Sequence, residues 1–218
     1  HGTSIGGIVV DGGNFDWTKN RKRQPLLNEP DQSYGGAIWA DAVPQLTGAN
    51  IPFVIRLRVV LLRDTGAPLA PFNAWQIIQG LETVGLRMKQ HCSNAEKVVT
   101  FLETQKKVKN VIYPTNHQGE IKERALKYMK GGYGSLVGMD VGTKENGAKF
   151  INNLKMLYHV ANIGDARSLA IHPATTTHSQ LNDEELLAAG VTPGYVRLSI
   201  GIEHPDDIVA DIKQALAA

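Results

Sequence analysis

Short strand patterns alternate with amphipathic helix patterns over the second half of this chain, and this alternation restricts the fold more than any other feature. Runs of β-branched and aromatic residues between turn signals predict strands. Apolar residues that recur every three or four positions predict helices. Such interleaving favours an α/β domain in which helices cover one face of a small sheet. The predicted strands are 111–113, 136–141, 169–172 and 195–200, and the predicted helices are 121–129, 144–157, 183–189 and a final helix that opens at Pro205.

The first half of the chain has a different rhythm. Pro71 opens the most strongly periodic helix of the sequence, because proline is favoured in the first turn of a helix. An apolar run ends at Gly66, which is typical of a helix C-terminus. The further expectations are a short buried strand at 8–10, an irregular stretch at 14–45, a helix-length run at 51–62 and an amphipathic run at 95–102.

Composition excludes several classes of function. The chain has 218 residues and a formal net charge of +2, which is too close to neutral to favour nucleic acid or an anionic membrane surface. Its longest apolar run is far shorter than the roughly 18 residues that span a bilayer. No secretory signal pattern is present, and a single cysteine, Cys92, leaves no disulfide framework. The sequence therefore favours the cytoplasm, with Cys92 as a small buried hydrophobe.

One strand carries an unusual residue. In the run 195–200, Val196, Leu198 and Ile200 share one face and Arg197 lies on the other. Arg197 is either a salt-bridged or solvent-reaching residue at a sheet edge, or a planar charged fork for a carboxylate. Asn162 and the threonines at 175–177 could donate further hydrogen bonds to the same anion.

The histidines do not indicate a metal. The seven histidines include no HExxH or other close ligand spacing, so the sequence predicts no metal site. His172 and His178 are interpreted as hydrogen-bonded structural residues, with proton transfer as the alternative. No Ser-His-Asp arrangement can be proposed from spacing alone.

Several motifs, taken together, resemble one family. His172-Pro173-Ala174, then Thr177-His178, then the run Val196 to Glu203 occur in the order seen in the Cys/Met-metabolism family of pyridoxal-phosphate enzymes. Upstream, Leu62 to Gly66, Pro71 to Ala74 and Gly80 to Thr83 resemble a second signature of that family, and the start at His1 resembles the segment just after its cofactor lysine. The resemblance covers nearly the whole chain.

The resemblance implies a fold and a cofactor. It implies the end of an aspartate-aminotransferase-like (fold type I) large domain over residues 1–70, then a linking helix and an α/β C-terminal domain over 71–218. Pyridoxal 5'-phosphate would be bound mainly by an N-terminal half, whose Schiff-base lysine is expected just upstream of His1. No catalytic residue is therefore expected in this chain. The complete enzyme is expected to be a homotetramer acting on a small amino acid.

The resemblance also implies substrate-binding residues. Arg197 corresponds to the family's carboxylate-binding arginine, assisted by Asn162 and Thr177. At the turn Ala161-Asn162-Ile163-Gly164, enzymes that handle cystathionine usually carry Glu, so this turn is more similar to the O-acetylhomoserine sulfhydrylase branch. Methionine γ-lyase and the cystathionine synthases and lyases stay open as alternatives. A different class of interpretation is a non-catalytic fragment, or a split half that needs a partner chain.

Overall fold

A computed structural model describes residues 3–218, which fall into two compact units. One unit is formed by Ser4–Ile78 and the other by Gln79–Ala218 together with Thr3. Each unit has its own cluster of buried apolar side chains. The assignment of 1–70 to a cofactor domain and of 71–218 to a C-terminal domain stays a prediction.

The unit Gln79–Ala218 is built on a mixed sheet, which within residues 3–218 has five strands in the order β1-β2-β5-β4-β3. All neighbouring pairs are antiparallel except β3 with β4. β5 is therefore a central strand, paired on both sides. The strands are β1 (Asn110–Ile112), β2 (Leu136–Asp140), β3 (Tyr158–His159), β4 (Leu169–Ile171) and β5 (Tyr195–Ser199).

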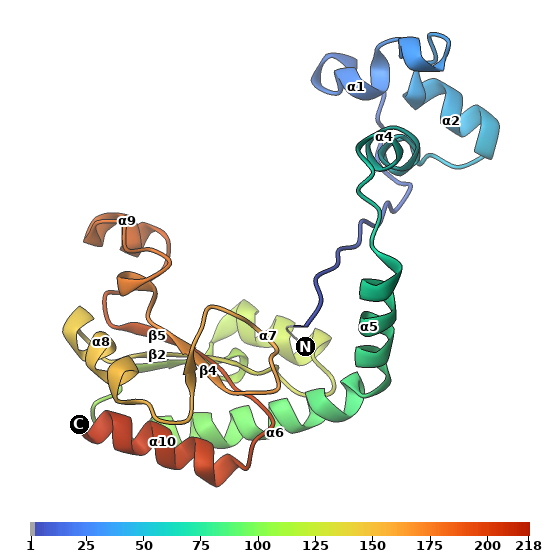
Figure 1. The fold of residues 1–218 in the computed structure, drawn as a ribbon. Helices are drawn as coiled ribbons and strands as arrows, with labels where there is room; N and C mark the ends of the chain where they lie inside the picture. Colours follow the sequence, from blue (N-terminus) through green and yellow to red (C-terminus); the bar gives the residue numbers. More distant parts are fainter. Residues whose placement is uncertain (1–2) are drawn as a thin grey trace. The chain divides into compact units, whose positions relative to one another are not determined.

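Helices cover one face of this sheet. Figure 1 shows α6 and α10 side by side along the sheet, in agreement with their packing contacts. Val196 and Leu198 from β5 are fully buried against this layer, as their alternation predicts. Burying each such side chain stabilises the fold by roughly 1.5–3 kcal/mol. The helices of this unit are α6 (Val84–Glu103), α7 (Gly119–Tyr128), α8 (Lys144–Asn153), α9 (Asp183–Ala188) and α10 (Pro205–Ala217), with 3-10 turns η4 (Pro114–Asn116) and η5 (Pro173–Thr175).

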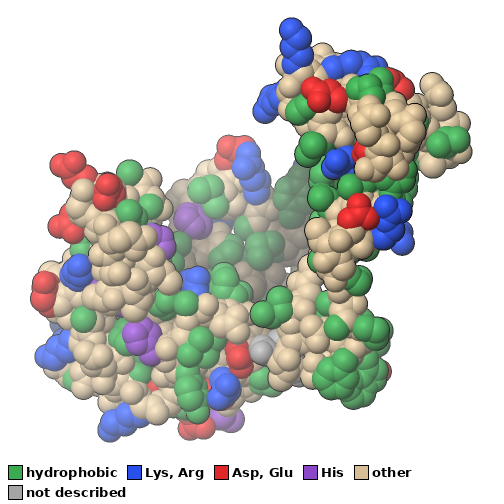
Figure 2. Space-filling view, turned by 45° about the horizontal axis from the view of Figure 1, so that its top comes forward, with side chains coloured by type: hydrophobic (Ala, Val, Ile, Leu, Met, Phe, Trp, Pro, Cys, Tyr) green, Lys and Arg blue, Asp and Glu red, His purple; other side chains and the backbone are tan. Residues whose placement is uncertain are grey.

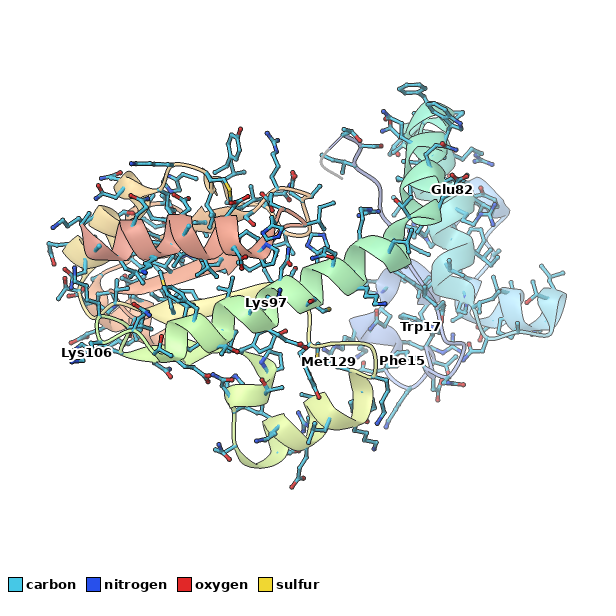
Figure 3. All side chains as sticks on the ribbon, turned by 90° about the horizontal axis from the view of Figure 1, so that it is seen from below. Phe15, Trp17, Glu82, Lys97, Lys106 and Met129 are labelled. Atoms are coloured by element: carbon cyan, nitrogen blue, oxygen red, sulfur yellow. The ribbon has the colours of Figure 1, made fainter. Side chains whose placement is uncertain are left out.

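The unit Ser4–Ile78 is helical. Figure 3 shows Phe15 and Trp17 lying together, with ring centroids 4.7 Å apart. Figure 2 shows hydrophobic side chains gathered on α5, where Phe72 and Trp75 are exposed. Its elements are η1 (Arg21–Arg23), α1 (Pro25–Asn28), η2 (Gln32–Tyr34), α2 (Trp39–Thr47), α3 (Pro52–Arg56), the π-helical η3 (Leu57–Leu62), α4 (Arg63–Thr65) and the start of α5 (Pro71–Glu82). Among residues 3–218 no single helix is long and apolar enough to cross a bilayer, although the bent pair Trp39–Thr47 and Pro52–Thr65 together has that length and composition.

Several local expectations were wrong. Residues 8–10 are extended and exposed instead of forming a buried strand, because none of the described strands pairs with them. The stretch 14–45 is not irregular, since it holds α1 and α2. The helix predicted to reach Leu157 ends at Asn153, because the next backbone N–H groups bind the carboxylate of Asp211. The short strand β3 was missed.

Candidate functional site

Arg197 lies on the face of the sheet opposite α6 and α10. Its neighbours Val196 and Leu198 point into the helix-covered core, so the pleat turns Arg197 to the other side. In register it lies between Gly138 of β2 and Ile171 of β4. The interpretation of Arg197 as a residue at the sheet edge is therefore wrong.

The guanidinium of Arg197 is incompletely satisfied. Its Nη2 donates one long hydrogen bond, 3.4 Å, to the main-chain oxygen of Asn162. Its Nε is buried without a hydrogen-bond partner, and none of the ion pairs within residues 3–218 includes Arg197. A buried donor without a partner costs roughly 1–3 kcal/mol, and more when it is charged. The arrangement therefore favours an added acceptor, and a carboxylate matches this planar fork.

A pocket of about 510 Å³ opens beside Arg197, mostly walled by apolar side chains. Gly138 leaves room for the Tyr195 ring, because a methyl group at this position would come within 2.7 Å of Tyr195 Cε2. Burial raises the pKa of the Tyr195 phenol, which keeps it neutral near pH 7. The pocket is lined by Ile112, Tyr113, Pro114, His117, Ile121, Arg124, Ala125, Tyr128, Met129, Leu136, Val137, Gly138, Tyr195 and Arg197.

The structure brings Asn162 to Arg197 through its backbone. Asn162 is exposed in a turn that Gly164 makes with a positive φ of 76°. The amide of Gly164 donates to Ser199 Oγ at 3.3 Å, which ties this turn to β5. The partner of the guanidinium is thus the main-chain oxygen of Asn162 and not its side-chain amide.

Thr177 bonds to its neighbour His178. It is exposed, and its hydroxyl lies 2.9 Å from Nδ1 of His178. Among the described residues, no hydrogen bond joins Thr177 to Arg197 or Asn162. Its assisting role stays a prediction.

His172 is a buried structural residue in this fold. Its Nε2 lies 2.8 Å from the oxygen of Pro193 and must donate there, while Nδ1 lies 2.9 Å from Thr175 Oγ1. Burial lowers its pKa, outweighing the bond to Pro193, so the ring is neutral near pH 7. The side chain is also packed against Gly147 of α8. This agrees with the hydrogen-bonded interpretation of His172.

Sequence reasoning missed Gly138 and Tyr195. Tyr195 shares the outer face of β5 with Arg197, and this alternation was a usable signal. Gly138 carried no such signal, because only the β2–β5 register places it opposite Arg197. Within residues 3–218, no group of three or more His, Cys, Asp or Glu side chains is arranged to hold a metal ion.

Residues 1–217 match the family described as Cys/Met metabolism PLP-dependent enzyme. The O-acetyl-L-homoserine sulfhydrylase of Leptospira meyeri is 47% identical over 221 residues, covering 99% of this chain and 50% of the relative. The homocysteine synthase of Schizosaccharomyces pombe is 44% identical over 217 residues, covering 99% of this chain and 49% of the relative. The chain thus spans about half the length of the curated relatives it matches.

A crystal structure shares the fold. A putative O-acetylhomoserine (thiol)-lyase from Campylobacter jejuni, which carries N'-pyridoxyl-lysine-5'-monophosphate, aligns with a TM-score of 0.79 at 41% identity. The alignment covers 93% of this chain and 47% of that one. This similarity, with the small helix-covered sheet, confirms the fold class expected from the sequence.

Proposed function

Because this chain belongs to the Cys/Met metabolism family of PLP-dependent enzymes, we propose that it is the C-terminal portion of an O-acetylhomoserine sulfhydrylase. That enzyme replaces the acetoxy group of O-acetylhomoserine with sulfide, so that acetate leaves and homocysteine forms. The names of the two relatives and of the solved structure support this branch over the cystathionine enzymes and methionine γ-lyase. The turn Ala161-Asn162-Ile163-Gly164, without a glutamate, supports the same branch.

The observation that carries the proposal is the unpartnered Nε of Arg197 on a central strand beside an open pocket. A free amino acid brings a carboxylate that accepts two parallel hydrogen bonds from such a fork. Held in this way, the substrate has one plane fixed, and orientation alone can lower a barrier by several kcal/mol. Asn162 and Thr177 would add neutral donors to the same carboxylate.

Pyridoxal 5'-phosphate, when bound, supplies the electron sink for the chemistry at the α-carbon. The residues of this chain fit a role in binding the substrate and not the cofactor, because Arg197 offers a planar fork for the substrate carboxylate. The chain spans about half the length of its relatives. We therefore propose that sequence beyond these 218 residues binds most of the cofactor and supplies the lysine to which it is linked. On this proposal the 218 residues alone are inactive.

The proposal extends to assembly. The partner is an N-terminal half, and the complete enzyme is a homotetramer in the cytoplasm. The exposed Phe72 and Trp75 of α5 support an apolar contact with further protein, because monomers rarely leave such side chains grouped in water. The single cysteine, Cys92, supports a reducing compartment. Light scattering of the complete protein tests the tetramer, and a concentration-independent monomer would contradict it.

The test is Arg197→Lys in the complete subunit that contains this chain. Lysine keeps the charge and loses the planar fork, so any damage reports geometry. We expect KM for O-acetylhomoserine to rise roughly tenfold or more and turnover to fall, as for the loss of a charge-assisted hydrogen bond of about 1.5–3 kcal/mol. The cofactor absorbance should stay normal. Arg23→Lys, at an exposed position of η1, is the matched control.

Cystathionine and methionine are assayed beside O-acetylhomoserine with sulfide. A higher activity with either competitor than with O-acetylhomoserine would assign the chain to another branch of the family. Unchanged rates for Arg197→Lys with every substrate would make Arg197 a structural strand residue and overturn the site. The intact mass and visible spectrum of the 218-residue chain test the cofactor statement, because a cofactor-linked lysine found in that chain alone would contradict it.

A further inference from the structure

The turn that carries Asn162 is tied to β5 and its extension at every second residue. Hydrogen bonds reach it from Arg197, from Ser199 and from the residues that follow β5. Because these hydrogen bonds recur at every second residue, they hold the segment 162–168 along β5 and the residues that follow it. They are Arg197 Nη2 to Asn162 O at 3.4 Å, Gly164 N to Ser199 Oγ at 3.3 Å, and Ile202 N to Ala166 O at 2.9 Å.

The strongest tie is at the end of the turn, between Ser168 and Glu203. The Glu203 carboxylate accepts from the Ser168 amide at 2.6 Å and from its hydroxyl at 2.9 Å. The same hydroxyl accepts from the Gly201 amide at 2.8 Å. Ser168 is completely buried. Charge-assisted bonds in a buried place are about twice as strong as neutral ones, so this Ser168–Glu203 clamp is the firmest anchor of the turn.

The backbone around the clamp is tightly packed. A methyl group on Gly201 would collide with Glu203 Oε2, with the Ala166 oxygen and with the Ser168 nitrogen. From α6, Asn94 Nδ2 donates to the oxygens of Gly201 at 3.0 Å and of Glu203 at 2.8 Å. The clamp is therefore joined to α6 by the two hydrogen bonds of Asn94.

We infer that the Ser168–Glu203 clamp is a positioning device that sets the Asn162 turn against Arg197 and so tunes affinity for the substrate carboxylate. The inference rests on the proposed function. Ser168 and Glu203 act through the turn, since the Glu203 carboxylate bonds to the amide and hydroxyl of Ser168, and that hydroxyl bonds to the amide of Gly201. The long Arg197–Asn162 contact, at 3.4 Å, is weak by itself, so its geometry depends on the firmer bonds six residues further along.

The experiment uses Ser168→Ala and Glu203→Gln in the complete subunit. Ser168→Ala removes the hydroxyl bonds, and Glu203→Gln removes the charge but keeps the shape, so it tests the clamp even if the first variant folds poorly. Both should raise KM for O-acetylhomoserine about three- to tenfold, in the range of one lost hydrogen bond. KM for sulfide, which has no carboxylate, should not change. Asn182→Ala, which removes the cap of α9, is the control for general destabilisation.

Two further measurements separate positioning from stability. Hydrogen exchange of the segment 160–168 should quicken in both clamp variants, with or without cofactor, and stay unchanged in Asn182→Ala. In a double-mutant cycle with Arg197→Lys, the clamp change should add less to KM than it does alone, because both act on one carboxylate site.

The outcomes distinguish the two proposals. If Arg197→Lys has no effect on any substrate, the proposed site itself fails. If Arg197→Lys raises KM but both clamp variants behave like Asn182→Ala, only the clamp inference is overturned. The clamp inference would also be overturned if the effects of Arg197→Lys and of a clamp variant on KM were additive in the cycle, or if KM for sulfide rose equally. The Ser168–Glu203 bond would then have a structural role only.

Discussion

Gly138 on β2 lies directly opposite Arg197 on β5, and a methyl group on Gly138 would come within 2.7 Å of Tyr195 Cε2. The absence of a side chain at this one position lets the Tyr195 ring lie over β2 beside the guanidinium. The shape of the pocket next to Arg197 therefore depends on a glycine of the neighbouring strand, directly opposite the arginine.

Gly138→Ala should displace the Tyr195 ring and disturb the pocket. We expect KM for O-acetylhomoserine to rise in the complete enzyme, and the fold to lose about 1–3 kcal/mol from overpacking. Gly131→Ala is the matched control, since a methyl group there meets open space. Steady-state kinetics and urea unfolding check both expectations, and equal behaviour of the two variants would contradict the pocket argument.

Asn162→Ala should have a milder effect than Arg197→Lys. The contact with Arg197 uses the main-chain oxygen of Asn162, which alanine keeps. Only a side-chain donor to the carboxylate is lost, worth about 0.5–1.5 kcal/mol, so KM should rise about two- to tenfold. Kinetics with O-acetylhomoserine measure it. A larger effect than that of Arg197→Lys would mean that the asparagine, and not the arginine, dominates binding.

Ala161→Glu tests the branch assignment. A carboxylate at this exposed position offers a partner for the distal ammonium of cystathionine and nothing for an acetyl group. We expect activity with O-acetylhomoserine to fall and affinity for cystathionine to rise. Competition between the two substrates measures the change, with Ala161→Gln as the uncharged control. No change in the ratio would remove Ala161 from the specificity argument.

Asp211 should make stability depend on acid pH. Burial raises the pKa of its carboxyl, but bonds from the amides of Leu157, Lys155 and Met156 outweigh it, so the pKa is lowered overall. The folded state then binds fewer protons than the unfolded state. This stabilisation is complete above the ordinary value of about 3.9 and is lost as pH falls through the lowered pKa.

Asp211→Asn should therefore reduce the free energy of unfolding near pH 7 by roughly 1.5–3 kcal/mol and flatten its fall below about pH 4. Urea unfolding between pH 3 and 7 checks this. Asp206→Asn, in the exposed first turn of the same helix, is the control. If the free energy of unfolding of Asp211→Asn fell as steeply with decreasing pH as that of the unmodified protein, another carboxylate would be responsible for the acid dependence.

Gly147→Ala should destabilise the fold, because its methyl group would collide with the imidazole of His172. The expected loss is about 1–3 kcal/mol. Gly85→Ala in α6 is the contrasting variant, since its methyl group has open space and helix propensity favours alanine by roughly 0.5–1 kcal/mol. Thermal unfolding of both proteins measures the difference, and a shift of the same sign would contradict the packing of His172.

The sequence by itself determined the features that depend on neighbouring residues. The alternation along 195–200 predicts the buried face of Val196 and Leu198, and the predicted helix 183–189 corresponds to α9. The motifs from His172 to Glu203 indicated the family, which the comparisons confirm. These signals are local, because strand and helix periodicity and capping act within a few residues.

Only the tertiary structure decided which partners lie far along the chain. Arg197 is a central strand residue with an unpartnered Nε because β5 lies between β2 and β4, and no pattern within β5 specifies these neighbours. The end of α8 depends on Asp211, which is more than fifty positions from the amides that it binds. The bond between Ser168 and Glu203 likewise joins residues that are 35 positions apart. Strand order and side-chain hydrogen bonds at such separations follow from how the elements pack, because a residue's type does not state which distant partner will satisfy it.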